Sequence, residues 1–200
     1  MIGGIAMKSA CLALLTMLLV AAIAPAAGAS AQGVVEVNGG FSKDENYGSY
    51  NPSGTLRGSA AIGGGYYRSL APMLSWGVDV ALEHLGSADF QSALLGDGQM
   101  SAKVFRINPA LRINLGTPLG PTLFVQAGGG LYNVTSEIKF DAGGTSNGSD
   151  TKFGANIGGG VSVPVGPRVR MNLYGQGHTV ATDQQSTMYF AVKAGLGLSI

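Results

Sequence analysis

The stretch KVFRINPALRINL, residues 103–115, alternates apolar and polar side chains with a period of two. A period of two is typical of a β-strand with two unlike faces. A soluble strand averages about 5–6 residues, whereas a tilted strand that crosses a bilayer needs about 9–11. The length favours one face in lipid and the other in a polar lumen. The two faces are Phe105, Ile107, Pro109, Leu111, Ile113 and Leu115 against Arg106, Asn108, Ala110, Arg112 and Asn114.

The N-terminus has the pattern of an export signal. Lys8 precedes an apolar run at residues 11–23, and Ala29-Ser30-Ala31 fits a signal-peptidase site. We therefore expect a cleaved signal peptide at residues 1–31 and an outer-membrane β-barrel domain at residues 32–200. An uncleaved membrane anchor is the alternative, which the short apolar run disfavours.

Composition excludes several classes of function. Cys11, the only cysteine, lies inside the expected signal, so the exported domain has no thiol and no disulfide. Without Lys8, eleven basic residues balance eleven acidic ones, and no basic patch predicts a nucleic-acid partner. The Gly-Gly-Gly runs are not followed by the lysine of a phosphate loop. We expect no cofactor, and with two scattered histidines no transition-metal site.

Alternation recurs in eight segments after residue 32, and the connections between them are unequal. The short connections, residues 69–75, 116–121 and 164–168, hold five of the eight prolines, as tight turns do. The long ones are rich in Ser, Asn, Asp and Gly, which predicts four extracellular loops opposite short periplasmic turns. The segments are residues 34–42, 59–68, 76–85, 103–115, 122–133, 152–163, 169–178 and 188–200, and the loops are residues 43–58, 86–102, 134–151 and 179–187.

A sheet edge cannot lie open in hydrocarbon, so the first and last strands are expected to pair. The fold class is therefore all-β, an eight-stranded antiparallel transmembrane up-and-down β-barrel. Such a barrel has an interior just filled by side chains. The strand number, the glycine-rich strands at residues 62–66, 127–131 and 157–161 and the alternating last strand resemble the small OmpA/OmpX-like outer-membrane barrels. That family commonly ends in Phe, which is thought to help recognition by the insertion machinery, whereas this chain ends in Ile200.

The inward faces carry charges of both signs, which predicts a polar network that plugs the lumen. Buried charges persist only when they are paired or hydrated, and so narrow an interior has little room for water. We expect Glu36 to meet Lys193 across the closing seam. On the third strand, Asp79 and Glu83 are expected to reach Arg112 and Arg106 of the fourth. The network is predicted to comprise Glu36, Asp79, Glu83, Arg106, Arg112 and Lys193.

Aromatic residues at outward positions predict two girdles, because aromatic rings favour the bilayer interface. One is expected near the long loops and the other near the short turns. The predicted girdle residues are Phe41, Phe105, Phe153 and Phe190 on the loop side, and Tyr66 and Trp76 on the turn side.

These features predict a structural or surface-interaction protein of the outer membrane rather than an enzyme. The expected partners are outer-membrane lipid and lipopolysaccharide, the insertion machinery through the last strand, and an extracellular ligand at the loops. A narrow porin-like channel is the first alternative. A barrel-embedded lipid-modifying enzyme or protease is another, for which His84 and His178 are candidates, although both are expected to be ordinary rim histidines. The remaining alternative is a soluble ligand-binding barrel. It is disfavoured because the bulky apolar residues would then face water and the charges would lie in the interior.

Overall fold

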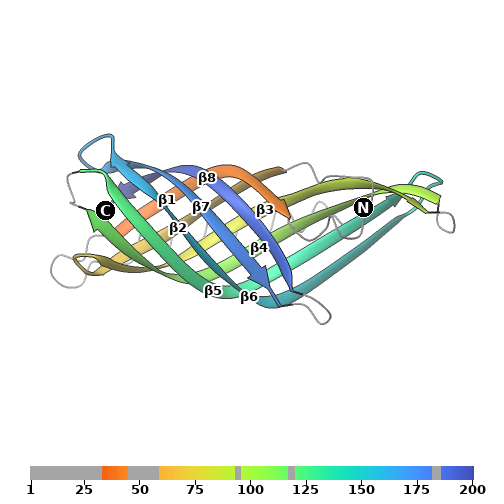
Figure 1. Ribbon diagram of the computed structural model, residues 1–200, viewed down its shortest axis with the longest axis horizontal. Helices are drawn as coiled ribbons and strands as arrows, with labels where there is room; N and C mark the ends of the chain where they lie inside the picture. Colours follow the sequence, from red (N-terminus) through yellow and green to blue (C-terminus); the bar gives the residue numbers. More distant parts are fainter. Residues whose placement is uncertain (1–32, 45–58, 93–95, 117–119, 182–185) are drawn as a thin grey trace.

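The computed structural model describes residues 33–44, 59–92, 96–116, 120–181 and 186–200. The expected signal peptide therefore lies outside the described residues. The model is all-β: eight antiparallel strands form a closed up-and-down barrel in which each strand pairs with its sequence neighbours and β1 pairs with β8 (Figure 1). The strands are β1 Gly33–Asp44, β2 Ser59–Ala71, β3 Leu74–Ser92, β4 Gly96–Gly116, β5 Thr122–Phe140, β6 Thr145–Pro164, β7 Val169–Val180 and β8 Thr187–Ser199.

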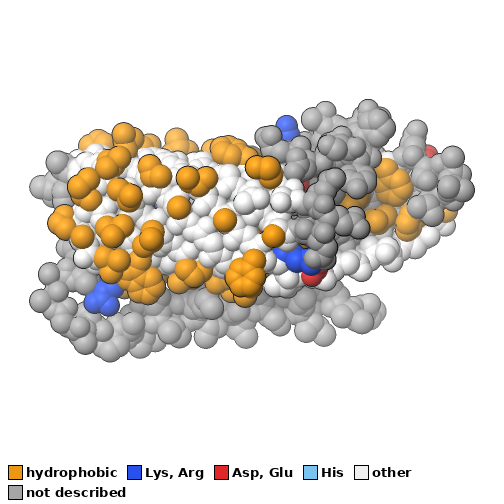
Figure 2. Space-filling model, turned by 60° about the horizontal axis from the view of Figure 1, so that its bottom comes forward, with side chains coloured by type: hydrophobic (Ala, Val, Ile, Leu, Met, Phe, Trp, Pro, Cys, Tyr) orange, Lys and Arg blue, Asp and Glu red, His pale blue; other side chains and the backbone are white. Residues whose placement is uncertain are grey.

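The predicted faces are confirmed by the exposure of the side chains. On β4, Arg106 and Asn108 are fully buried, whereas Leu111 and Ile113 are about half exposed on the opposite face. Large apolar side chains cover the outside of the barrel in Figure 2, and the charged residues of the barrel strands are mostly hidden within it. Val80 is an exception, because its register is outward but only 8% of its surface is exposed. No helix among the described residues is long and apolar enough to cross a membrane.

The predicted loops at residues 86–102 and 134–151 are largely wrong, because the structure continues the strands through them. β3 and β4 stay paired up to Ser92 and Gly96, and β5 and β6 up to Lys139 and Thr145. The strands β3 to β6 therefore extend as a four-stranded sheet past the ends of the other four, toward the right of Figure 1. We call this part the protruding sheet.

The polarity of the two faces inverts where the protruding sheet begins: the outer face changes from apolar to polar, and the inner face from polar to apolar. Within the barrel, β5 places Leu131 outward and Tyr132 inward; further along, Asn133 is outward and Val134 inward. The outer face of β4 changes in the same way, because the apolar Phe105 is followed, two residues earlier in the chain, by the charged Lys103. On β3, a register shift between His84 and Gly86 moves the following residues to a new phase. The protruding sheet thus has a polar outer face and a more apolar inner face.

Ring packing fixes the tip of the protruding sheet. The rings of Phe90 and Phe140 meet edge to face at 6.1 Å between centroids. Gly98 lies between them in the register, and a methyl group added to it would meet the Phe90 ring at 2.8 Å and the Lys139 carbonyl oxygen. These contacts belong to the inner face, which explains why a segment that looks like a polar loop folds as a hairpin.

Candidate functional site in the barrel interior

The centre of the barrel holds a buried group of four charges, which we call the central cluster: Asp79, Glu83, Arg106 and Lys193. Arg106 Nη1 lies 2.8 Å from Asp79 Oδ2, and its Nε lies 3.3 Å from Glu83 Oε2. Lys193 Nζ pairs with the other oxygen of Glu83. All four residues are at most 2% exposed. Two acids and two bases make the cluster neutral. This matters because buried charges are stable only when opposite charges compensate them.

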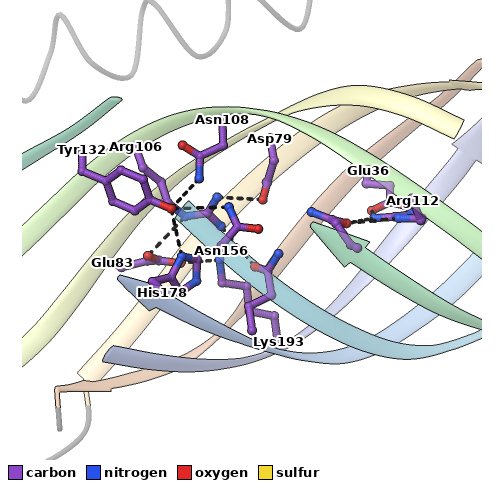
Figure 3. A network of polar contacts seen from close by, with 12 residues as sticks. Glu36, Asp79, Glu83, Arg106, Asn108, Arg112, Tyr132, Asn156, His178 and Lys193 are labelled. Atoms are coloured by element: carbon purple, nitrogen blue, oxygen red, sulfur yellow. Dashed lines mark hydrogen bonds and ion pairs between the residues drawn. The ribbon is translucent and has the colours of Figure 1, made fainter. Parts of the chain in front are cut away.

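Side chains from distant strands complete the central cluster, whose four charged residues are labelled in Figure 3. Tyr189 on β8 donates its hydroxyl hydrogen to Glu83 at 2.6 Å. Arg106 Nη2 donates to the side-chain oxygen of Gln176 on β7 at 3.2 Å. The cluster therefore joins β3, β4, β7 and β8 across the lumen.

A second ionic group, nearer the short turns, surrounds Arg112 (Figure 3). Its guanidinium pairs with both carboxylate oxygens of Glu36 and donates to Gln126 Oε1 from Nε at 3.1 Å and from Nη2 at 2.9 Å. The guanidinium carbon also lies 3.8 Å from the ring centroid of Tyr67 and 4.5 Å from that of Phe124. An arginine held flat between rings and anchored by a bidentate pair has little freedom to swing aside.

A third polar group, around the partly buried Arg170, lies at the turn end of the interior. Arg170 Nε donates to Ser162 Oγ at 2.8 Å, and Nη2 donates to Thr122 Oγ1 and to the Gly120 carbonyl oxygen, both at 3.0 Å. These contacts join β5, β6 and β7.

The structure corrects two of the predicted ion pairs. Lys193 lies opposite Gly40 on β1, four residues from Glu36, and four residues of strand span about 13 Å. Glu36 pairs with Arg112 instead, and Lys193 with Glu83. Arg112 does not pair with Asp79, because Arg106 lies opposite Ala81 and takes the two acids on either side of it. Partners on β1 and β4, or on β3 and β8, are three strands apart, so they meet across the lumen.

Glycines on the inward face make room for the bulky side chains. A methyl group added to Gly154 would lie 2.7 Å from the Tyr132 ring, and one added to Gly77 would lie 2.6 Å from the Tyr67 ring. The rings lie where side chains on the neighbouring strands would otherwise be. The glycine-rich strands therefore provide space for a filled interior.

His178 is not a rim histidine, because it is only 3% exposed. Its ring stacks on that of Tyr189 at 4.4 Å, and its Nδ1 lies 3.2 Å from the Tyr132 hydroxyl. Tyr132 and Tyr189 also belong to a buried apolar group with Leu85, Val104 and others, which covers the central cluster on the loop side. No set of His, Cys, Asp or Glu residues in the described part of the chain is arranged to hold a metal ion.

Comparison with solved structures identifies the type of barrel. Neisserial surface protein A has a TM-score of 0.60 at 14% identity, over 86% of this chain and 100% of that one. The N-terminal β-barrel domain of Pseudomonas aeruginosa OprF has a TM-score of 0.53 at 17% identity, over 86% and 100%. Ail, the attachment invasion locus protein of Yersinia pestis, has 0.53 at 12%, over 86% and 99%. This chain has the fold of the small eight-stranded outer-membrane β-barrels. No family model and no curated protein matches its sequence.

In a barrel of this type, the outward aromatic residues are expected at the two membrane interfaces. Phe41 and Phe153 are the most exposed, at 70% and 71%, and Phe190 and Trp76 are 45% and 42% exposed. Phe105 and Tyr66 are also on the outside by register but half buried. The two girdles remain a prediction.

Several buried residues of the interior were not among the residues predicted for the network. Gln126, Gln176 and Asn108 are at most 2% exposed, and each hydrogen-bonds to a buried side chain. Their inward positions in alternating strands were a usable signal, because an uncharged amide on that face needs a buried partner. His178 carried the same signal, because it is two residues from Gln176 on the inward face of β7.

Proposed function

We propose that this protein is a structural and surface-interaction barrel of the outer membrane with a closed interior. The observation that carries the proposal is the reversed arrangement of polarity, with large apolar side chains outside and paired charges inside. A soluble barrel would expose that apolar surface to water, whereas a bilayer buries it. The solved structures with this fold, which are outer-membrane proteins, support the same location.

The facial inversion supports an orientation. Apolar outward residues end near Phe105 and Leu131, and polar outward residues begin at Lys103 and Asn133. We place the upper surface of the hydrocarbon there, with the protruding sheet outside the cell and the short turns in the periplasm. The polar outer face of the protruding sheet would then lie beside the sugars of lipopolysaccharide, and the alternating strand β8 would be the part that the insertion machinery recognises.

Insertion is tested by expressing the full chain and separating the membranes. The folded barrel should appear in the outer-membrane fraction and run on a gel at a different mobility before and after heating, because a closed barrel resists detergent until it is heated. A chain that stays soluble, with the same mobility in both samples, would contradict the membrane proposal.

The closed interior is tested in planar bilayers. We expect the purified protein to be electrically quiet, because the central cluster and the Arg112 group both cross the lumen. Replacing Glu36 with Ala leaves Arg112 without its carboxylate, so water should enter and brief openings should appear. Val37→Ala is the matched control, because Val37 is the next residue but is 51% exposed on the outside. Stable, large conductance of the unmodified protein would contradict the plug and favour the channel.

We propose no enzymatic activity. The His178 ring stacks on Tyr189 and meets the Tyr132 ring edge to face, and its Nδ1 is already within hydrogen-bonding distance of the Tyr132 hydroxyl. A hydrolase needs a nucleophile that contacts such a base. Loss of a measured lipase or protease activity on replacing His178 with Ala, in a barrel that still folds, would contradict this proposal.

A further inference from the structure

β6 is an edge strand in the protruding sheet. Its pairing with β7 ends at Gly154, and the last contact is a hydrogen bond from the Ala181 nitrogen to the Phe153 carbonyl oxygen at 2.9 Å. Residues 145–151 pair with β5 on one side only; within the described part of the chain, no strand pairs with them on the other. Every one of these residues is exposed. We call residues 145–151 the β6 edge.

The β6 edge lacks most of the features that usually protect an exposed strand. Natural sheets protect their edges with lysines, prolines or bulges, because a row of unpaired N–H and C=O groups is a template for another strand. The β6 edge reads TSNGSDT: it has no lysine or proline, its one charged residue is Asp150, opposite Val134, and its register with β5 does not shift. The β3 edge differs, because it has a register shift next to Gly86, whose φ is 112°.

Small residues on the β6 edge leave the apolar inner face accessible from the side. Ser146 and Gly148 face inward in this register, and a methyl group added to Gly148 would have no atom within 4 Å. Ile138 on β5 lies directly opposite Ser146 and is partly exposed. A side chain from a strand added beside β6 would therefore pass over Ser146 or Gly148 and contact Ile138.

We propose that the β6 edge binds an extended segment of another polypeptide, which adds a fifth strand to the protruding sheet. The unpaired backbone requires a partner with free backbone N–H and C=O groups, and the inner face requires an apolar side chain at every second position of that partner. The inference deepens the proposed surface function and rests on it, because the edge is available only if the protruding sheet lies outside the cell.

The probe is a short synthetic peptide that alternates valine with threonine, labelled with a fluorophore, and added to the folded barrel in detergent. A second peptide carries N-methyl groups along one backbone edge, so it keeps the side chains but loses hydrogen-bond donors. We expect saturable binding of the first peptide, and slower amide hydrogen exchange confined to the β6 edge and the adjoining β5. The N-methylated peptide should bind at least about tenfold more weakly, since several hydrogen bonds are lost.

Two matched variants locate the binding site. Gly148→Lys puts a charge on the inner side of the β6 edge and should abolish binding. Ser101→Lys adds the same charge to the outer face of β4, where it lies opposite Glu137, and should bind like the unmodified protein. Equal binding of both peptides, or protection at the β3 edge instead, would overturn the proposal. Protection of the β6 edge without peptide, in a concentration-dependent dimer, would assign the edge to a second copy and would also overturn it.

The folded state is checked by heat-dependent gel mobility before any peptide is added. A chain that does not fold in detergent would count against the proposed membrane function. A folded barrel that binds neither peptide would overturn only the inference about the β6 edge.

Discussion

Glu83 is the residue on which the closed interior should depend most strongly. Its carboxylate accepts hydrogen bonds from Arg106 Nε, from Lys193 Nζ and from the Tyr189 hydroxyl, and the side chain is fully buried. Glu83→Gln keeps the size of the side chain but removes its charge. The central cluster would then hold two cations and one carboxylate, and the amide NH2 of Gln would face a cation.

The expected loss follows from the cost of a buried charge without its partner. Breaking a buried ion pair by removing one side costs about 3–5 kcal/mol, and removing both sides together costs much less. We therefore expect Glu83→Gln to lower the free energy of unfolding by about 3 kcal/mol, and the double variant Glu83→Gln with Lys193→Met to recover about 2 kcal/mol of it. The exposed pair Glu137 and Lys139, 3.3 Å apart, provides the control, because Glu137→Gln should change stability by less than about 1 kcal/mol.

The assay is urea unfolding of the barrel in lipid vesicles, followed by the fluorescence of Trp76, the only tryptophan of the chain. The double-mutant cycle then gives the coupling between Glu83 and Lys193. A loss below about 0.5 kcal/mol for Glu83→Gln, equal to that of Glu137→Gln, would refute the reasoning. Such a result would mean that water hydrates the central cluster and that the lumen is not closed.

Two other predictions concern the barrel wall. Leu111→Arg, on the outer face, should destabilise the inserted barrel by about 2–4 kcal/mol, whereas Gln99→Arg on the polar outer face of the protruding sheet should leave vesicle insertion unchanged; equal insertion of both would contradict the assigned membrane boundary. Gly130→Ala should cost about 1–3 kcal/mol in urea unfolding, because its methyl group would meet the Ile107 carbonyl oxygen and lie 2.7 Å from Asn108 Oδ1. Gly177→Ala, whose methyl group would meet its nearest atom at 3.9 Å, should cause no loss, and a similar loss in both would show that the inward face is not tightly packed.

The prediction of the barrel strands succeeded because side-chain direction in a strand is a local property. Each residue points to the face opposite its neighbour, so the apolar and polar positions of residues 103–115 could be assigned without any knowledge of the fold. The prediction of the loops failed at residues 86–102 and 134–151, although these segments also alternate. Their apolar residues lie on the opposite face from those of the barrel, with Met100 and Ile138 inward and Gln99 and Glu137 outward. A search for strands with apolar outward residues does not recognise them.

The sequence by itself determined the number of strands in the barrel, their two faces and the set of charges that lies inside. It could do so because a period of two and the need to pair every strand in hydrocarbon are sufficient for those conclusions. Only the tertiary structure decided which charges meet. The stagger of the strands sets Lys193 opposite Gly40 rather than Glu36, and the narrow lumen brings Glu36 to Arg112 and Lys193 to Glu83 from strands that are not neighbours. Such contacts depend on the diameter and shear of the closed barrel, which no single strand contains.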